Sequence, residues 1–418
     1  MATINLFVSA ITLILLSTAV LAGDVEVLHY MTSTGEAAAI EVLKEELRAS
    51  GHSWKEVAVA GGGGETAMTV LKFRALSGNP PAAAQIKGPQ IQEWGEQGLL
   101  TSLDSIASAG HWDELLPPVV SNMMKYQGEY VAVPVNVHRV NWLWANPDVF
   151  RKAGVAIPTT WDQFFEVANV LKSKGILPLA YGGQTWQDAT FFETVALGVG
   201  GAEFYSSAFV DLNQKTLTSA TMVKVFETFR KTREYTDADA DAPGRDWHLA
   251  TRMVSNGEAA MQIMGDWAKG EFTAAGQHAD VDYVCLAAPD TSGAFIFNID
   301  SFAMFELRDS DAREAQADLA RLVMEPMFQQ AFNVNKGSIP ARLGMDRAAF
   351  DSCAHASMDA FVASAATAQL VPSMAHGMAT SSQVQSAIYD VVTAFYNSKN
   401  LSAKEAVDKL AHAIDAAR

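Results

Sequence analysis

The chain has 418 residues, of which 49% are hydrophobic and 18% are charged, and it carries 30 Lys and Arg against 47 Asp and Glu. This length and apolar fraction predict two globular domains. The net charge of -17 argues against nucleic acid or an anionic membrane surface as a partner, because both attract clustered Lys and Arg.

An apolar leader opens the sequence. The stretch from Leu6 to Leu16 carries no charge, and the small residues Val20 and Ala22 fit a signal-peptidase site after Ala22. A membrane-spanning helix would need a longer apolar stretch, and no Cys stands there to carry a lipid anchor. We therefore predict a signal peptide over residues 1–22 and an exported protein that is free in solution.

Two cysteines, Cys285 and Cys353, are the only ones in the chain. An exported protein meets an oxidising compartment, in which an isolated pair usually closes. We expect one disulfide, with two buried free thiols as the alternative, because a sequence does not show whether two Cβ atoms lie close together.

The first hundred residues alternate strand and helix patterns. Residues 25–30 predict a strand, and a helix is expected from Glu36 to about Ala49. Residues 57–60 and 82–86 predict two further strands, each followed by a helix, and together these patterns indicate a mostly parallel sheet flanked by helices. Because ligands bind at the carboxyl ends of such strands, the segments 30–36 and 85–87 are candidate site loops.

Residues 130–137 form an extended run with one Pro, which we interpret as a crossing between two domains. Thr160 and the preceding Pro158 predict a helix start, and helical patterns dominate from there to Tyr235. Three strand-like runs, 282–288, 295–299 and 302–305, suggest a return to the first sheet. The chain from Ala365 to Arg418 is expected to be helical to its end.

Several familiar motifs fail on inspection. The glycine run 61–64 is followed by Glu65, which would repel a phosphate, so a nucleotide loop is disfavoured. Asp237, Asp239 and Asp241 alternate like a calcium loop, but the Gly and Glu that such a loop needs are missing. No His or Cys pattern indicates a metal site, and no nucleophile motif is found. We expect neither a metal nor a cofactor.

Two tryptophans, Trp247 and Trp267, each stand beside charged residues. A single Trp is usually part of a core, but the repetition favours a sugar site, because sugars present apolar faces to aromatic rings and hydroxyl edges to polar side chains. The segments 298–301, 335–338 and 374–377 contain polar residues that fit such edges.

At these residues the sequence closely resembles the periplasmic glucose-binding proteins of bacterial ABC sugar importers, in the family of extracellular solute-binding proteins that includes maltose-binding protein. The likeness runs nearly from end to end. It is carried by T-S-x-G-E from Thr32, A-G-G-G-G-E-T-A-M-T-V-L-K from Ala60, G-N-P-P-A-A-A-Q-I-K-G-P from Gly78, V-A-V-P-V-N-V-H-R-V-N-W-L-W from Val131, G-R-D-W, M-G-D-W-A-K, N-I-D-S, N-K-G-S-I-P-A-R and P-S-M-A-H-G-M-A-T.

The resemblance implies an α/β fold of the type II periplasmic binding protein class, with two α/β lobes and a ligand cleft between them. It assigns residues 23–134 with 286–338 to lobe 1 and residues 135–285 with 339–418 to a helix-rich lobe 2. The expected function is to bind glucose or a related monosaccharide in the periplasm and to deliver it to the transmembrane subunits of an ABC permease. The residues expected to line the site are Tyr30, Met31, Glu36, Gln85, Lys87, Trp247, Trp267, Asp300, Lys336 and His376.

The chain departs from these relatives at Tyr30-Met31, where they have two adjacent Trp residues. Met offers a softer and smaller surface than Trp. One hypothesis is therefore a hexose site with a weakened or shifted preference, and the alternative is that Met31 only fills a gap.

Two other function classes stay open. A secreted carbohydrate-active enzyme would use the same aromatic rings with two carboxylates across the scissile bond, and a binding protein for a larger glycoside would need a longer site. Among the expected site residues only Glu36 and Asp300 are acidic, so we expect a monomeric binding protein and no enzyme. A chemoreceptor is a further partner that is compatible with import.

Overall fold

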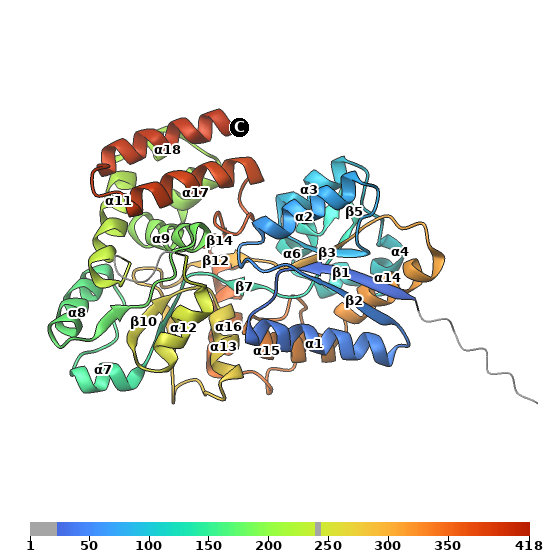
Figure 1. Ribbon diagram of the computed structural model, residues 1–418, viewed down its shortest axis with the longest axis horizontal. Coiled ribbons are helices and arrows are strands. Elements are labelled where there is room, and N and C mark those ends of the chain that lie inside the picture. The colour runs from blue at the N-terminus through green and yellow to red at the C-terminus, as the bar shows by residue number, and fades with distance from the viewer. Residues whose placement is uncertain (1–22, 239–243) are drawn as a thin grey trace, which may run out of the picture.

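The computed structural model describes residues 23–238 and 244–418. The predicted signal peptide, together with Asp239 and Asp241 of the acidic loop, lies outside the described residues. Two separate hydrophobic clusters give the molecule two lobes, which lie side by side in Figure 1. The α/β fold predicted from the sequence is confirmed.

The first lobe is built on a five-stranded sheet with the order β2-β1-β3-β13-β6. β1 pairs in parallel with β2 and β3, whereas β13 runs antiparallel to β3 and β6. Its strands are β1 (Asp24–His29), β2 (Ser53–Ala58), β3 (Ala83–Ile86), β6 (Ala132–Pro134) and β13 (Ser301–Met304), and a separate hairpin is formed by β4 (Lys125–Tyr126) and β5 (Glu129–Tyr130). The helices of this lobe are α1 (Thr34–Ala49), α2 (Glu65–Leu76), α3 (Pro89–Glu96), α4 (Asp104–Ala109), α5 (Trp112–Leu115), α6 (Pro118–Met123), α14 (Ser310–Val323) and α15 (Pro326–Lys336).

The second lobe surrounds a four-stranded sheet with the order β11-β8-β10-β9. β8 runs antiparallel to both of its neighbours. Its strands are β8 (Trp142–Ala145), β9 (Leu177–Leu179), β10 (Ala259–Ile263) and β11 (Val284–Ala287). Helices make up most of this lobe: α7 (Pro147–Ala153), α8 (Trp161–Ser173), α9 (Thr185–Phe209), α10 (Gln214–Leu217), α11 (Ala220–Thr232), the 3-10 helix η1 (Arg233–Tyr235), α12 (Trp247–Ser255), α13 (Trp267–Ala274), α17 (Ser382–Asn397) and α18 (Ala403–Ala417).

A small sheet with the order β14-β12-β7 lies between the two halves in Figure 1. It contains β7 (His138–Arg139), β12 (Phe295–Asn298) and β14 (Leu370–Pro372), and α16 (Ser352–Ala366) packs against it. The chain leaves the first sheet at β6, passes through β7 and enters the second sheet at β8. The extended run predicted as a crossing therefore does connect the two sheets.

Two expectations were wrong, one about which strands rejoin the first sheet and one about the structure after Ala365. Of the three strand-like runs predicted to rejoin the first sheet, only β13 does so, because β11 pairs with β8 and β12 pairs with β7 and β14. The chain after Ala365 is not helical throughout, since β14 pairs in parallel with β12. In each case the pairing partner is remote in sequence, so local pattern carries no signal for it.

Local signals placed the first elements well. Ser33 is the N-cap of α1 and forms a capping box with Glu36, so this helix begins two residues earlier than predicted. Thr160 caps α8 by accepting a hydrogen bond from the backbone N–H of Gln163, as its sequence indicated.

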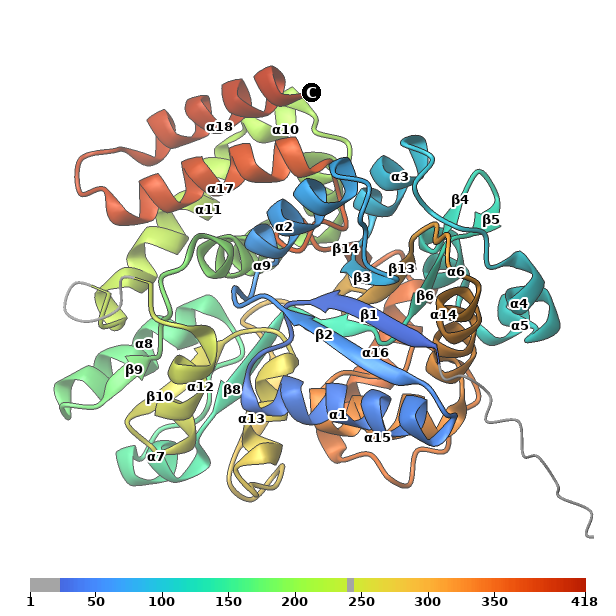
Figure 2. The same ribbon diagram turned by 45° about the vertical axis from the view of Figure 1, so that its right-hand side comes forward.

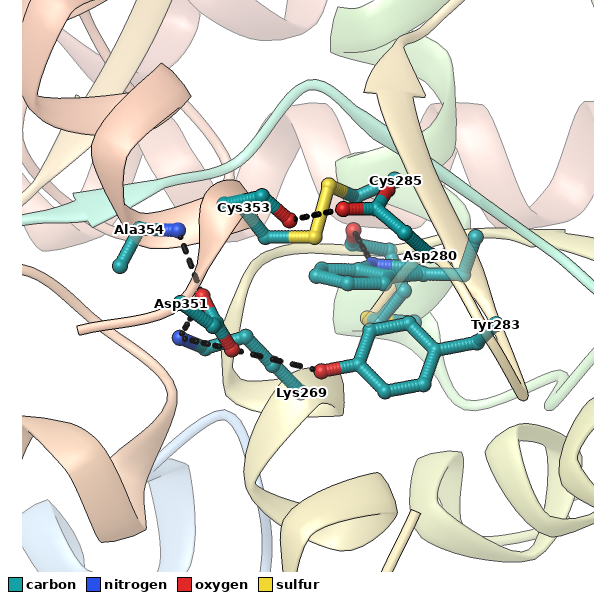
Figure 3. The surroundings of a disulfide bond; sticks show 10 residues. Lys269, Asp280, Tyr283, Cys285, Asp351, Cys353 and Ala354 are labelled. Atoms are coloured by element: carbon teal, nitrogen blue, oxygen red, sulfur yellow. Dashed lines mark hydrogen bonds and ion pairs between the residues drawn. A yellow bond between two sulfur atoms is a disulfide. The ribbon is translucent and has the colours of Figure 1, made fainter. Parts of the chain in front are cut away.

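Cys285 of β11 and Cys353 of α16 form a disulfide with an S–S length of 2.00 Å. Figure 3 shows it above an ion pair between Lys269 and Asp351. The bond therefore connects the sheet of the second lobe to the helix that packs beside the crossing strands.

Candidate functional site

A small cavity lies where residues of both lobes meet, close to the carboxyl ends of β1, β3 and β12. It leaves about 20 Å³ for the centre of a water molecule, which is room for very few waters. The residues that line it are Tyr30, Glu36, Gly62, Gln85, Lys87, His138, Trp186, Trp247, Trp267, Asn298, Asp300, Lys336 and His376.

Nine of the ten residues expected in the site line this cavity, and Met31 does not. Met31 is 2% exposed and belongs to the apolar core of the first lobe. Successive side chains of an extended chain point to opposite sides, so Tyr30 and Met31 face different surroundings just after β1 ends. Whether the nine residues contact a ligand stays a prediction.

Glu36 and Lys336 form a buried ion pair at one wall of the cavity. Lys336 Nζ lies 2.7 Å from Glu36 Oε1, while Glu36 Oε2 accepts hydrogen bonds from the backbone N–H groups of Thr32 and Ser33. Burial alone would raise the pKa of Glu36, but the Lys336 ammonium and these hydrogen bonds hold it below its ordinary value. The carboxylate is thus ionised, and both of its oxygens already have protein partners.

Asp300 occupies the turn between β12 and β13 and is 2% exposed. Its Oδ2 accepts hydrogen bonds from Asn136 Nδ2 at 3.3 Å and from His138 Nε2 at 3.0 Å, and its Oδ1 lies 3.6 Å from Lys87 Nζ. Burial opposes ionisation, yet Lys87 and His138 hold the pKa of Asp300 well below its usual range. Asp300 is therefore charged at neutral pH.

His138 joins the two lobes electrostatically, because it stands between Asp300 and Asp266. Its Nε2 bonds Asp300 and its Nδ1 bonds the Asp266 carboxylate at the start of α13. Burial would lower the pKa of His138, but the two carboxylates raise it above its ordinary value. Asp266 also accepts the backbone N–H of Arg139 at 2.9 Å, which fixes α13 to the crossing strand β7.

Aromatic rings form a second part of the wall. The Trp267 ring lies 5.3 Å from the His138 ring, 4.8 Å from the His376 ring and 6.3 Å from the Trp186 ring, measured between centroids. Burial and the nearby Lys87 and His138 cations place the pKa of His376 well below its ordinary value. His376 is thus neutral, and the wall is apolar with polar edges.

The glycine run between β2 and α2 closes the cavity from the side of the first lobe. A Cβ on Gly62 would come within 2.8 Å of the Trp186 ring, and one on Gly64, whose φ is +84°, would meet the Tyr30 ring at 2.8 Å. Only glycine permits this approach of backbone to aromatic surface. The run predicted not to bind phosphate therefore has a steric role.

Three residues that line the cavity each have a buried polar atom without a hydrogen-bond partner in the described structure. They are Asp300 Oδ1, Asn298 Oδ1 and Trp267 Nε1. Buried polar atoms are normally paired, since each unpaired one costs about 1–3 kcal/mol. Two acceptors and one donor are available here to a ligand that both donates and accepts hydrogen bonds.

Sequence reasoning did not assign His138, Trp186 and Gly62 to the site, and it named Asn298 only as part of a polar segment. His138 and Asn298 do lie within the quoted motifs, beside the crossing strand and before Asp300. Trp186 lies in the first turn of the long helix α9, within the stretch Gly183-Gln184-Thr185-Trp186-Gln187-Asp188. A Trp beside polar and charged residues that follow a glycine is the signal that could have found it.

Within residues 23–238 and 244–418 no group of three or more His, Cys, Asp or Glu side chains is arranged to hold a metal ion. Over the same residues, none of the helices has the length and apolar character that a membrane crossing requires.

A family model described as bacterial extracellular solute-binding protein matches residues 32–305. A protein of Brucella melitensis, named a probable sugar-binding periplasmic protein, is 46% identical over 94% of this chain and 93% of its own length. A protein of Rhizobium meliloti with the same name is 44% identical over 95% of each chain. These relatives confirm the periplasmic location predicted from the leader.

Solved structures confirm the fold. A chitin oligosaccharide binding protein matches with a TM-score of 0.80 and 17% identity over 95% of this chain and 99% of its own. The solute receptor AcbH, described as having an exclusive preference for β-D-galactopyranose, matches with a TM-score of 0.79 and 17% identity over 95% and 100%. Given the family model and the extent of the sequence matches, the chain belongs to the bacterial extracellular solute-binding protein family.

Proposed function

We propose that the protein is the substrate-binding component of an ABC importer and that it binds a monosaccharide, glucose or a related hexose, in the cavity between its lobes. The observation that carries this proposal is the set of three unpartnered polar atoms, on Asp300, Asn298 and Trp267, in a cavity walled by tryptophan rings. A sugar supplies hydroxyl groups that donate and accept hydrogen bonds, together with apolar C–H faces for the rings.

Discrimination among sugars then depends on whether the hydroxyl groups of the sugar form hydrogen bonds with the buried polar atoms of the site. A sugar that lacks a hydroxyl group opposite Asp300 leaves its Oδ1 with the Lys87 ammonium 3.6 Å away but without a hydrogen bond, which costs about 1–3 kcal/mol. The cavity as described has room for very few waters, so the lobes, with the boundaries expected from the sequence, open to admit a sugar ring. Closure would present a surface of both lobes to the permease.

The names of the relatives support the sugar class. Two curated relatives are named probable sugar-binding periplasmic proteins, and the structural neighbours include receptors for galactopyranose and for raffinose. Because these neighbours bind single sugars as well as oligosaccharides, the preference for a monosaccharide rests on the resemblance of the sequence to glucose-binding proteins.

The geometry favours binding over catalysis. A glycosidase needs one carboxyl group that is protonated at its working pH. The pKa values of Glu36 and Asp300 are both held low, and Glu36 has protein partners on both oxygens. Neither carboxyl group is suited to act as a general acid.

Calorimetry of the purified protein with D-glucose, D-galactose, D-mannose and D-xylose tests the proposal. We expect one of the hexoses to bind with 1:1 stoichiometry and to raise the melting temperature. Incubation of the same protein with aryl glycosides should yield no free aglycone. Absence of binding to all four sugars, or turnover of a glycoside, would contradict the proposal.

A second candidate ligand, a larger glycoside, is favoured by one further observation. A groove of about 800 Å³ adjoins the cavity and shares Tyr30, Lys87 and His376 with it. The same calorimetry with maltose and methyl β-D-glucoside distinguishes the two ligands, because a site that extends into the groove binds the disaccharide more tightly than its monosaccharide.

A further inference from the structure

Glu193 is a fully buried carboxyl group on α9 that takes no direct part in the cavity. Its Oε1 accepts a hydrogen bond from Ser373 Oγ at 2.6 Å. Its Oε2 accepts three more, from the backbone N–H groups of Met374 at 2.8 Å and Ala375 at 3.1 Å and from the Tyr205 hydroxyl at 2.6 Å. An ionised carboxylate accepts about four hydrogen bonds, so this one is saturated.

Three of these four donors belong to the segment that carries His376 into the cavity. Ser373 Oγ also accepts the backbone N–H of His376 at 3.0 Å, which connects Glu193 to His376 through two hydrogen bonds. The segment leaves β14 at Pro372 and reaches the first lobe at Gly377, whose carbonyl oxygen would meet a Cβ on Gly88 at 2.5 Å. Its path is therefore fixed on one side by Glu193 and on the other by the opposite lobe.

The same helix also fixes the ring of His376. Thr190, which precedes Glu193 by one helical turn, donates its hydroxyl hydrogen to the Trp186 carbonyl at 2.7 Å. The Thr190 oxygen must then accept from His376 Nε2, which lies 3.0 Å away. The proton of the neutral ring thus resides on Nε2, and Nδ1 keeps a lone pair.

We propose that Glu193 is a positioning residue of the sugar site, which holds the Ser373–Ala375 backbone so that His376 meets the ligand as a neutral hydrogen-bond acceptor. This inference rests on the proposed function for the identity of the ligand.

The electrostatics agree with this assignment. Burial raises the pKa of Glu193 to about 7, because none of its four hydrogen-bond donors is a cation. Such a carboxylate stays ionised only while its donors remain in place. Movement of the segment and loss of the charge are therefore coupled.

Asp188 provides a matched control. It is also fully buried on α9, burial likewise raises its pKa, to about 6, and its donors are the hydroxyl groups of Tyr181 and Thr393, neither of which belongs to the His376 segment. Asp188→Asn and Glu193→Gln thus make the same chemical change on one helix, but only the second alters the support of His376.

The first measurement needs no sugar. In protein labelled with ¹⁵N-histidine, the signal of His376, identified by its loss in His376→Gln, should show the Nε2–H tautomer in the wild type and in Asp188→Asn. In Glu193→Gln and in Ser373→Ala we expect a shifted signal or a mixture of tautomers. An unchanged His376 signal in both of these variants would overturn the proposal, as would an equal change in Asp188→Asn.

The second measurement uses D-glucose in calorimetry. We expect Glu193→Gln and Ser373→Ala to raise the dissociation constant about tenfold. Asp188→Asn should raise it by less than about twofold. Equal affinities in all four proteins would overturn the inference. If the wild type binds no glucose, the proposal of a glucose site fails, and the histidine spectra still decide the role of Glu193. Should Glu193→Gln fail to fold, Ser373→Ala decides both measurements.

Discussion

Two ionic clusters meet at the first turn of α13 and differ in one respect. Asp266, the N-cap, and Trp267 join His138, Asp300 and Lys87 around the cavity, where Asp300 Oδ1 and Trp267 Nε1 have no hydrogen-bond partner in the described structure. Lys269, two residues after Trp267, reaches the disulfide region.

In the cluster beside the disulfide, the charged groups of Lys269 and Asp351 have hydrogen-bond partners. Lys269 Nζ lies 3.0 and 3.1 Å from the two carboxylate oxygens of Asp351, which also caps α16 through the backbone N–H of Ala354 and accepts the Tyr283 hydroxyl (Figure 3). Since unpaired buried polar atoms cost free energy, a cluster that keeps them is suited to a ligand and a cluster without them to holding the fold. Figure 2 shows α13 close to α1 and α15.

The largest expected effect is a loss of stability when the disulfide is removed. Replacing Cys285 and Cys353 together by Ser opens a loop of 68 residues, and we expect the free energy of unfolding to fall by about 4 kcal/mol. Urea denaturation measures this loss, and calorimetry with D-glucose should show an affinity unchanged within about twofold. A parallel loss of affinity would mean that the disulfide cluster and the cavity are not independent.

The next largest effect is a loss of ligand affinity when Asp300 in the cavity is replaced. Asp300→Asn removes the charge that pairs with Lys87 and His138, and it presents a donor where the ligand needs an acceptor. We expect D-glucose to bind about a hundredfold more weakly. Asp351→Asn is the matched control, and it should lower the stability while the affinity stays within about threefold. The comparison fails if both variants weaken binding alike.

The pH dependence of stability tests whether His138 is a cation between Asp266 and Asp300. Its pKa in the folded protein is raised above 6.5, so its contribution is fully present below that value and is lost as the pH rises through the folded-state pKa. The difference in unfolding free energy between the wild type and His138→Asn should therefore be largest near pH 6 and should shrink toward pH 9. A difference that stays constant over this range would show a neutral imidazole.

The smallest expected effect is the difference in ligand affinity between variants of the adjacent residues Tyr30 and Met31. Tyr30 lines the cavity and Met31 lies in the core, so Tyr30→Leu should weaken D-glucose binding by about tenfold, whereas Met31→Leu should leave it unchanged. The stability of Met31→Leu should change by less than about 1.5 kcal/mol, because the volume is nearly conserved. Calorimetry and urea denaturation measure both effects. Weaker binding in Met31→Leu would restore this residue to the site.

Much of the site could be predicted because it is built from short motifs at strand ends. Tyr30 follows β1, Lys87 follows β3 and Asp300 follows β12, and each of these positions can be recognised from a local strand pattern. Met31 was expected in the site for the same reason, and it does not line the cavity, since the motif locates a pair of residues without showing which of them faces inward.

By itself, the sequence determined the α/β class, the first three strands with their helices, and the cap at Thr160, because alternation and capping act between residues a few positions apart. Only the tertiary structure decided the placement of β11 and β14 and the position of His138 between two carboxylates. His138 is 128 residues from Asp266 and 162 from Asp300. Contacts over such separations depend on how the lobes pack, and no local pattern encodes them.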